Sequence, residues 1–312
     1  MSLPLAAMAS LGASAVAAPF VMKALIAAKS RQTISAHIQE HAHKQGTPTM
    51  GGIIALIGIL AGFGVGWTEE LVAPLVLLIG FAIVGFADDY IVPKMMPGKR
   101  GLGWMPKLGL EIGASIAAAW LTGWKEPLQI GAFVFLILFL SNAYNFADGL
   151  DSLAGGLGMI LCAGLAAAFP SPAMILVGAI MFVAFIPFLF YNAPPARVFM
   201  GDVGSLPLGA LIGWMVAVAL LPTASGAFLD VGAILPMTLI LLVMLAEIVP
   251  VPLQIASVKL RKKRLFNFKT PIHHAFQEKG WPETRIVWMF HLVQLSCVVV
   301  ALCLIHLNSG GK

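Results

Sequence analysis

Long apolar segments recur along the whole of this chain, and they restrict its fold more than any other feature. A helix needs about 20 consecutive apolar residues to cross a bilayer, and about ten segments meet that need. They begin near Leu3, Gly51, Leu71, Leu108, Ile130, Leu153, Ala173, Ser205, Val231 and Ile286. Inside a bilayer each backbone polar group needs a partner within the protein, which favours helices over irregular structure. The sequence predicts an all-α polytopic membrane protein with about ten transmembrane helices.

The composition leaves little material for a soluble domain. Of the 312 residues, 59% are hydrophobic and 11% are charged, whereas about a quarter of the residues in a soluble domain are charged. The first twenty residues lack the basic region of a secretory signal, so we expect a retained first span. The three cysteines lie in or beside apolar segments, where free Cys usually serves packing. We expect a single transmembrane domain over residues 1–312.

Basic residues are confined almost entirely to alternate connections between the apolar segments. Of the 19 Lys and Arg residues, all but Lys125 and Lys312 fall in one set of connections. These connections span residues 22–49, 88–107, 142–152, 191–204 and 259–285. Cytoplasmic loops of membrane proteins carry an excess of Lys and Arg. The charge pattern therefore predicts that this set faces the cytoplasm and that both termini lie outside.

The polar clusters of the sequence fall in the same set of connections. They read KQGTPTMGG (44–52), DDY (88–90), NAYNFADGLD (142–151), YNAPPARVFMGD (191–202) and KTPIHHAFQEKGW (269–281). A carboxylate at membrane depth is costly and marks a functional position that water or a ligand reaches. Because the clusters share one side, we expect them to converge on a single site at the cytoplasmic face.

Aspartates in these clusters suit a site for a divalent metal and phosphate. They are Asp88, Asp89, Asp148, Asp151 and Asp202. The i, i+3 spacing of Asp148 and Asp151 directs both side chains to the same face of a helix or turn. Mg²⁺ usually takes one or two carboxylates together with phosphate oxygens and water. Lys44, Lys107 and the His pair at 273–274 are suited to neutralise phosphate charge during transfer.

Each cluster also has a simpler structural explanation. The aspartate pair can be a solvated helix cap, DGLD a turn, and GTPTMGG a tight loop entering a helix. GTPTMGG is not a P-loop, because its Lys precedes the glycines. The His pair alone fits an ordinary polar loop, and RKKRLFNFK (261–269) fits the positive-inside signal. Glu111 is expected near the interface, and Glu247 is left unassigned. Together on one side, however, the clusters favour a site.

The order of these motifs resembles a known family of membrane transferases. The segments KQGTPTMGG, FADDY (86–90), NAYNFADGLDSLAGG (142–156), VFMGDVGSLPLG (198–209) and TPIHHAFQEKGWPETR (270–285) are similar to motifs of the phospho-N-acetylmuramoyl-pentapeptide transferases (MraY translocases). That family belongs to the polyprenyl-phosphate N-acetylhexosamine-1-phosphate transferases. The DD, NxxDGxD and GD motifs are shared across this superfamily, whereas TPTMGG and IHH…EKGWPE are more specific to the muramoyl-pentapeptide branch.

The resemblance implies a reaction, a cofactor and a location. UDP-MurNAc-pentapeptide and undecaprenyl phosphate would give lipid I and UMP in peptidoglycan synthesis, with Mg²⁺ as cofactor. The enzyme would lie in the bacterial cytoplasmic (inner) membrane, with its active site facing the cytoplasm and both termini outside. The family also suggests a homodimer, and no nucleic-acid partner is expected.

The resemblance also assigns roles to individual residues. Asp202 would be the principal Mg²⁺ ligand, and Asp88, with Asp89, would either deprotonate the lipid phosphate or act as a nucleophile. The nucleotide-sugar pocket would be lined by Asn145, Asp148 and Asp151, with Asn192 nearby. Phe199 would supply a face for uracil. Phosphates would be supported by Lys44, Thr49 and Lys107, and the sugar-phosphate end by His273 and His274.

Three positions depart from the family pattern. Ala275 stands where a third consecutive His is usual, Val92 where a Lys is common, and Ser152 where a Gly is usual. These differences concern the sugar and lipid ends of the implied site.

Three other functions account for less of the sequence. A sister transferase that uses UDP-GlcNAc to start another cell-envelope glycan shares the carboxylate motifs but not TPTMGG and EKGWPE. A cation-coupled transporter predicts charged groups near mid-span and repeated broken helices, whereas these acids come at segment ends. A purely structural membrane scaffold gives no reason for sorting the polar clusters to one side.

Overall fold

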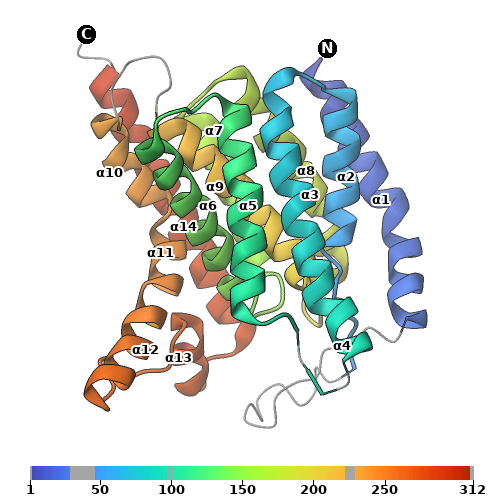
Figure 1. Cartoon of the computed structure of the whole chain (residues 1–312), viewed down its shortest axis with the longest axis vertical. Helices are drawn as coiled ribbons and strands as arrows, with labels where there is room; N and C mark the ends of the chain where they lie inside the picture. The colour runs from blue at the N-terminus through green and yellow to red at the C-terminus, as the bar shows by residue number, and fades with distance from the viewer. Residues whose placement is uncertain (1, 29–45, 97, 100, 222–228, 310–312) are drawn as a thin grey trace.

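The computed structural model describes residues 2–28, 46–96, 98–99, 101–221 and 229–309, and the described chain is built from helices (Figure 1). The long elements are α1 (Leu3–Ala27), α2 (Ile53–Val65), α3 (Val72–Phe86), α5 (Trp104–Thr122), α6 (Pro127–Ala147), α7 (Leu153–Ala168), α8 (Pro172–Asn192), α9 (Asp202–Leu220) and α14 (Glu283–Ser309). The shorter ones are the 3₁₀ turn Glu69–Leu71, the π-helical turn Ala87–Ile91, α4 (Val92–Met95), α10 (Val231–Ile240), α11 (Leu242–Ile248), α12 (Pro250–Arg261) and α13 (Ile272–Glu278).

The predicted all-α membrane protein is confirmed. Within the described residues, seven helical stretches are long and apolar enough to cross a membrane: Leu3–Ala27, Glu69–Met95, Pro127–Ala147, Pro172–Asn192, Asp202–Leu220, Leu242–Arg261 and Glu283–Asn308. Three shorter apolar helices, α2, α7 and α10, lie among them. Each of the apolar segments expected from the sequence is therefore helical, including the segment expected from Leu108, which lies within α5.

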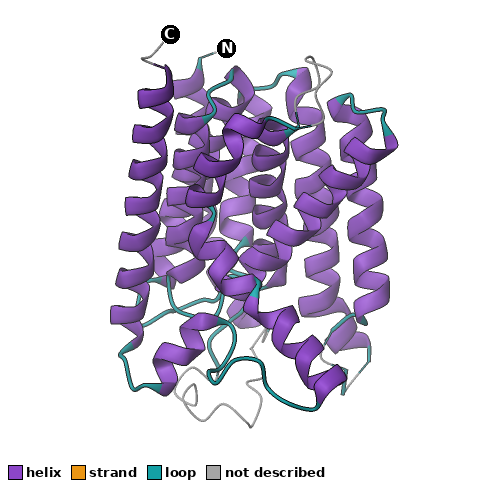
Figure 2. Cartoon of the chain, turned by 90° about the vertical axis from the view of Figure 1, so that its left-hand side faces the viewer, coloured by secondary structure: helices purple, strands orange, loops and turns teal. Residues whose placement is uncertain are grey.

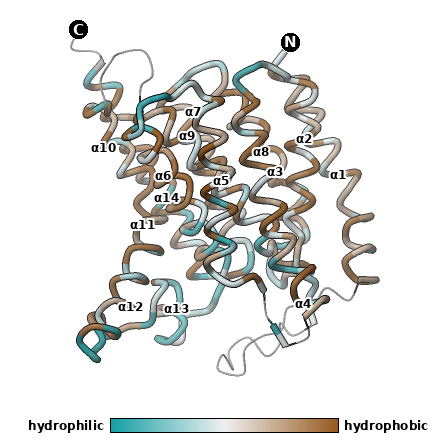
Figure 3. The backbone as a smooth tube through the Cα atoms, in the orientation of Figure 1, coloured by the Kyte–Doolittle hydropathy of each residue, from teal (hydrophilic) through white to brown (hydrophobic). Residues whose placement is uncertain are grey.

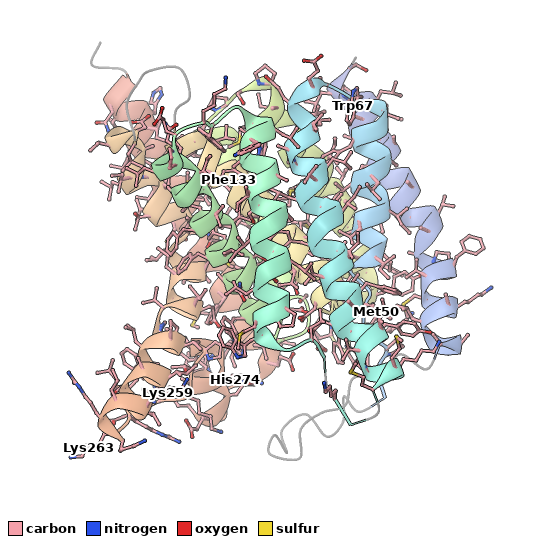
Figure 4. All side chains as sticks on the ribbon, viewed as in Figure 1. Met50, Trp67, Phe133, Lys259, Lys263 and His274 are labelled. Atoms are coloured by element: carbon pink, nitrogen blue, oxygen red, sulfur yellow. The ribbon has the colours of Figure 1, made fainter. Side chains whose placement is uncertain are left out.

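The two ends of the helix bundle differ in what they carry. The N-terminus of α1 and the C-terminus of α14 lie at one end, whereas α4, α12 and α13 lie at the other (Figures 1 and 2). Lys259, Lys263 and His274 are found at the α12–α13 end, far from Trp67 (Figure 4). The α12–α13 region is also distinctly hydrophilic, while the middle of the bundle is mostly apolar (Figure 3). The end that holds α4, α12 and α13 is called the polar end below.

Helix α9 forms the centre of the bundle. Every residue from Val203 to Ala217 is buried, and the helix packs against α6 and α3 and, less extensively, against α7. A helix that is apolar all round is typical of a buried position. Because α9 begins at Asp202 at the polar end, the central helix fixes the position of this carboxylate.

The segment from Val231 to Arg261 is a broken helix rather than one straight span. Breaks at Leu241 and Val249 divide it into α10, α11 and α12, and Pro236 lies inside α10 while Pro250 begins α12. Proline removes a backbone donor and disrupts the helix at the preceding turn. As a result α12 leaves the bundle at an angle, and with α13 it extends the polar end outward (Figure 1).

Candidate active site

Asp88 and Asp89 lie on the π-helical turn Ala87–Ile91 between α3 and α4. The sequence suggested a helix that ends at these residues, but the helix continues through them to Met95 with one wide turn. Such turns are rare and often occur at functional sites. Backbone amides orient both carboxylates: Leu102 N–H donates to Asp88 Oδ1 at 2.8 Å, and Val203 N–H donates to Asp89 Oδ2 at 3.0 Å.

Lys107, in the first turn of α5, joins the aspartate pair to Asp202. Its Nζ donates to Asp202 Oδ2 at 2.5 Å and lies 4.0 Å from Asp88 Oδ2. The three side chains are 19–23% exposed, so they are shielded from bulk water but still accessible. The predicted convergence of the DD and GD motifs with Lys107 is therefore present in the structure.

Asn145, near the C-terminus of α6, holds the opposite side of Asp202. Its amide Nδ2 donates to Asp202 Oδ1 and to Ser205 Oγ, each at 2.8 Å. Asp202 is thus held by an ammonium on one oxygen and by an amide on the other. Ser205 was not predicted as a site residue, because a serine within an apolar helix has no distinguishing pattern in the sequence.

The TPTMGG segment pairs with the loop that leads into α9. Phe199 N–H donates to Pro48 O at 2.9 Å, Gly51 N–H to Phe199 O at 2.8 Å and Gly52 N–H to Met200 O at 3.0 Å. Gly201, at φ +74°, then turns the chain into Asp202. A side chain at Gly201 would meet Asp89 Oδ2 and Thr49 Oγ1, at 2.6 and 2.7 Å from its Cβ. Thr49 and Asp89 therefore lie on the same side of Gly201, and the support of phosphates by Thr49 stays a prediction.

The charge of this site is unbalanced. Among the described residues, the ion pairs of Asp88 and Asp202 are with the ammonium of Lys107, whereas the amides of Asn145 and of the backbone, which bind Asp202 and Asp89, carry no net charge. Asp89 also lies at the N-terminus of α9, where the helix dipole favours negative groups. The excess of carboxylate suits a divalent cation and the phosphates it accompanies.

A second group of residues holds the loop after α6, here called the 148–152 loop. Asp151 N–H donates to Glu283 Oε1 at 2.6 Å, and Ser152 N–H donates to Asn192 Oδ1 at 2.9 Å. Asp151 is only 5% exposed, and its Oδ2 accepts a hydrogen bond from Ala196 N–H at 2.9 Å. This loop is therefore tied both to the segment that follows α8 and to the start of α14.

The remaining predicted residues are placed as follows. Asp148 directly follows α6 and is partly exposed, whereas Asn192 is 3% exposed and donates through Nδ2 to Val198 O at 2.8 Å. The side chain of Phe199 is partly exposed. Lys44 lies outside the described residues. Glu283 was not predicted, because a single Glu at the start of a helix looks like an ordinary first-turn acid.

His273 and His274 both lie on α13, but in different surroundings. His273 is 1% exposed and its Nδ1 lies 2.7 Å from Glu247 Oε2. His274 is partly exposed, and its Nδ1 lies 2.8 Å from Gln277 Oε1. The two rings are 4.2 Å apart between centroids. Glu247 is fully buried, and Glu111, one turn beyond Lys107 on α5, is 2% exposed. The expected position of Glu111 near the membrane interface stays a prediction.

The carboxylates of the site are candidate ligands for a metal ion. Among the residues that the structure describes, no three His, Cys, Asp or Glu side chains are grouped closely enough to hold a metal ion by themselves. The donor chemistry nevertheless fits Mg²⁺, which accepts one or two carboxylates and completes its shell with water and substrate phosphates. Asp202, with Asp88 on the other side of Lys107, supplies these hard oxygen donors.

Comparison with known proteins gives the class and then the family. Residues 71–220, from α3 to α9, match Glycosyl transferase family 4, which is consistent with a polytopic helical fold that gathers carboxylates at one end. Residues 44–54 match phospho-N-acetylmuramoyl-pentapeptide-transferase signature 1.

Curated relatives cover most of the chain. Phospho-N-acetylmuramoyl-pentapeptide-transferases of Heliobacterium modesticaldum, Symbiobacterium thermophilum and Deinococcus radiodurans are 37%, 34% and 33% identical to it. The alignments cover 82%, 91% and 82% of this chain, and 82%, 90% and 84% of the respective relatives. The chain belongs to the phospho-N-acetylmuramoyl-pentapeptide-transferase family.

Proposed function

We propose that this protein transfers phospho-MurNAc-pentapeptide from UDP-MurNAc-pentapeptide to undecaprenyl phosphate, forming lipid I and UMP. The observation that carries the proposal is the pairing of the family signature with the carboxylate site. Backbone hydrogen bonds hold residues 48–52 against residues 199–200, directly before Asp202. The segment that distinguishes this family and the carboxylates shared with its class therefore form one site.

The site lies where both substrates can meet. One substrate is a soluble nucleotide and the other is a lipid phosphate, so transfer requires a site at a membrane surface. Asp88, Asp202 and Lys107 lie at the polar end of helices that otherwise suit a bilayer interior. The group moves between two phosphates, so catalysis depends mainly on positioning and on neutralising charge.

The proposed transfer exchanges one phosphorus–oxygen bond for another. An oxygen of the lipid phosphate forms a bond to the sugar-linked phosphorus, and the bond from that phosphorus to the oxygen of UMP breaks. Asp88, supported by Asp89, accepts the proton of the lipid phosphate. Lys107, 4.0 Å from Asp88 and hydrogen-bonded to Asp202, offsets negative charge as it shifts towards the leaving UMP.

The nucleotide sugar is proposed to bind between α6, the loop before α9 and α13. Asn145, Asp148 and Asp151, with Asn192 nearby, define the pocket, and the partly exposed ring of Phe199 offers a face for uracil. Thr49 and Lys44 support phosphates from the signature segment. His274, partly exposed on α13, is suited to the sugar-phosphate end, and His273 lies behind it.

Mg²⁺ is proposed as the cofactor. Asp202 and Asp88 would hold it, and when bound it would neutralise the diphosphate of the nucleotide sugar. Asn145 binds one oxygen of Asp202 and Lys107 binds the other, so the carboxylate is oriented before substrate arrives.

The placement in the membrane is also a proposal. We propose about ten crossings, by α1, α2, α3, α5, α6, α7, α8, α9, α10–α12 and α14, with the polar end in the cytoplasm and both termini outside. The basic residues of α12 and of the turn after it, from Lys259 to Arg264, support this orientation. A homodimer, tested by cross-linking in native membranes, completes the proposal.

The direct test measures UMP release by the purified protein. UDP-MurNAc-pentapeptide, undecaprenyl phosphate and Mg²⁺ together should release UMP, and omission of either the lipid or the metal should abolish release. UDP-GlcNAc is the matched alternative donor. Release from UDP-GlcNAc but not from UDP-MurNAc-pentapeptide would overturn the proposal and would assign the protein to the sister transferases.

A further inference from the structure

Glu247, which the sequence left unassigned, binds His273 at two points. Glu247 Oε1 accepts a hydrogen bond from His273 N–H at 3.1 Å, and Glu247 Oε2 lies 2.7 Å from His273 Nδ1. Because a carboxylate accepts, Nδ1 carries the hydrogen of this contact. The two side chains are 0% and 1% exposed. One carboxylate of α11 thus fixes both the backbone and the ring orientation of a residue on α13.

The other ring nitrogen faces the 148–152 loop. His273 Nε2 is buried and has no hydrogen-bond partner among the described residues. A Cβ added at Gly149 would lie 2.5 Å from Nε2 and 2.9 Å from Cε1, so the ring packs directly on the backbone of Gly149. The ring cannot swing away to relieve such a contact without losing its bond to Glu247. Gly149 does not have a positive φ, which means that its lack of a side chain, rather than its backbone conformation, is what this contact requires.

We infer that Glu247 and His273 are positioning residues that hold the 148–152 loop in its place after Asn145, whose amide binds Asp202. The ring braces Gly149 from the interior, while Glu283 Oε1 accepts from Asp151 N–H on the same loop. The C-terminal part of the chain therefore fixes the loop at both residues that flank Leu150. His274, whose ring lies 4.2 Å from that of His273, is positioned by the same pair.

This inference rests on the proposed function for its consequence. Because the 148–152 loop lines the proposed nucleotide-sugar pocket, loss of the pair should weaken binding of the nucleotide sugar and leave the lipid phosphate unaffected. A purely structural role would instead reduce the amount of folded enzyme, which lowers kcat per mole of protein without a selective change in either KM.

The kinetic test compares Glu247→Gln with Glu278→Gln. Glu247→Gln keeps the side-chain volume but places an amide N–H₂ or a neutral oxygen against Nδ1, so the ring loses its fixed orientation. The KM for UDP-MurNAc-pentapeptide should rise about tenfold, since small misplacements of binding groups have effects of this order or larger. The KM for undecaprenyl phosphate should stay within about twofold of wild type. Glu278, which is exposed at the end of α13 and lies 3.8 Å from Lys269, is the control and should change neither KM. An unchanged nucleotide KM in Glu247→Gln, or equal increases in both KM values, would overturn the inference.

A second test needs no substrate and remains valid if the enzyme uses another nucleotide sugar. Gly149→Ala should lower the Tm of the purified protein in the wild-type background, because the new methyl group overlaps the fixed ring. In the His273→Ala background the same change should lower the Tm by less than half as much, because the obstructing ring is absent; contacting residues are expected to show such non-additivity. Equal losses in the two backgrounds would show that the ring does not brace Gly149, whatever the donor substrate is.

Discussion

Asp202 shows how a single residue can organise this site. It is the first residue of α9, which is buried from Val203 to Ala217, and it accepts a hydrogen bond from Lys107 on one oxygen and from Asn145 on the other. These contacts come from α5 and α6, so the carboxylate is oriented by neighbouring helices before substrate binds. Preorganised groups of this kind act on the transition state without a cost of reorganisation.

The substitution Asp202→Asn tests this role. The amide keeps the size of the side chain and one acceptor oxygen, so the Tm should stay close to that of wild type. Activity should fall by about 100-fold or more, because the negative charge proposed to hold the metal is lost. UMP release at saturating Mg²⁺ is the measurement, and retention of half the wild-type rate would contradict the assignment.

The position of Lys107 predicts the direction in which its loss would change the Mg²⁺ requirement. Its ammonium binds Asp202 Oδ2 and lies near Asp88. It therefore offsets the negative charge of the same carboxylates that would hold Mg²⁺. Lys107→Met should lower kcat, because the cation near the phosphates is lost. It should also lower the Mg²⁺ concentration for half-maximal rate by up to about fivefold, which corresponds to about 1 kcal/mol for a partly exposed charge pair.

The measurement for Lys107 is a Mg²⁺ titration of initial rates. Lys94→Met serves as the matched control, because Lys94 is exposed and bonds Tyr90 Oη at 2.9 Å rather than the carboxylates. The prediction fails if Lys107→Met requires more Mg²⁺ than wild type, since Lys107 would then assist metal binding rather than oppose it.

At the scale of elements, the junction of α2 with the start of α9 depends on two glycines. A Cβ at Gly52 would overlap the Cα of Gly204, and a Cβ at Gly204 would lie 2.6 Å from the Cα of Gly52. The neighbouring atoms are backbone, so neither helix can relieve the overlap by a side-chain movement. This close approach allows the signature segment to pair with residues 199–200.

Gly52→Ala should therefore destabilise the protein by about 1–3 kcal/mol, the usual range for overpacking. Gly64→Ala on the same helix is the control, because nothing lies within 4 Å of the position of its added Cβ. Thermal unfolding in detergent measures both variants. A Tm for Gly52→Ala that equals that of Gly64→Ala would show that α2 and the start of α9 can separate freely.

Several elements could be predicted from the sequence, and others could not. The apolar segments were recognisable because lipid requires long uncharged runs, and the cluster of Asp88, Lys107 and Asp202 was recognisable because polar groups were sorted to alternate connections. The pairing of Pro48 with Phe199 uses backbone atoms, which every residue has, so the residue types do not predict it. Glu247 on α11 and His273 on α13 become partners through the tertiary fold, and so do Asp151 and the backbone of Ala196, so residue types alone could not identify these pairs.

At the scale of the whole molecule, the proposed orientation in the membrane can be tested by labelling. The test uses a variant with Cys162, Cys297 and Cys303 replaced by Ser. A single cysteine introduced at position 125 or at position 263 then reports the accessibility of one or the other end of the helix bundle. Both native lysines are exposed. An impermeant maleimide should label Lys125→Cys in intact cells, and Lys263→Cys only after permeabilisation. Labelling of Lys263→Cys from outside would reverse the orientation and would exclude a cytoplasmic active site.

The dispersed origin of the site has a consequence for how the protein is made. The site is contributed by the loop before α2 (Thr49), the turn after α3 (Asp88), α5 (Lys107), α6 (Asn145) and α9 (Asp202), and the brace on Gly149 arrives only with α13. A chain still emerging from the ribosome, with α8 inserted but α9 not yet made, holds the aspartate pair without its opposing carboxylate. The nascent protein therefore cannot act on its substrates until nearly its whole length has entered the bilayer. The active site is completed late in biogenesis.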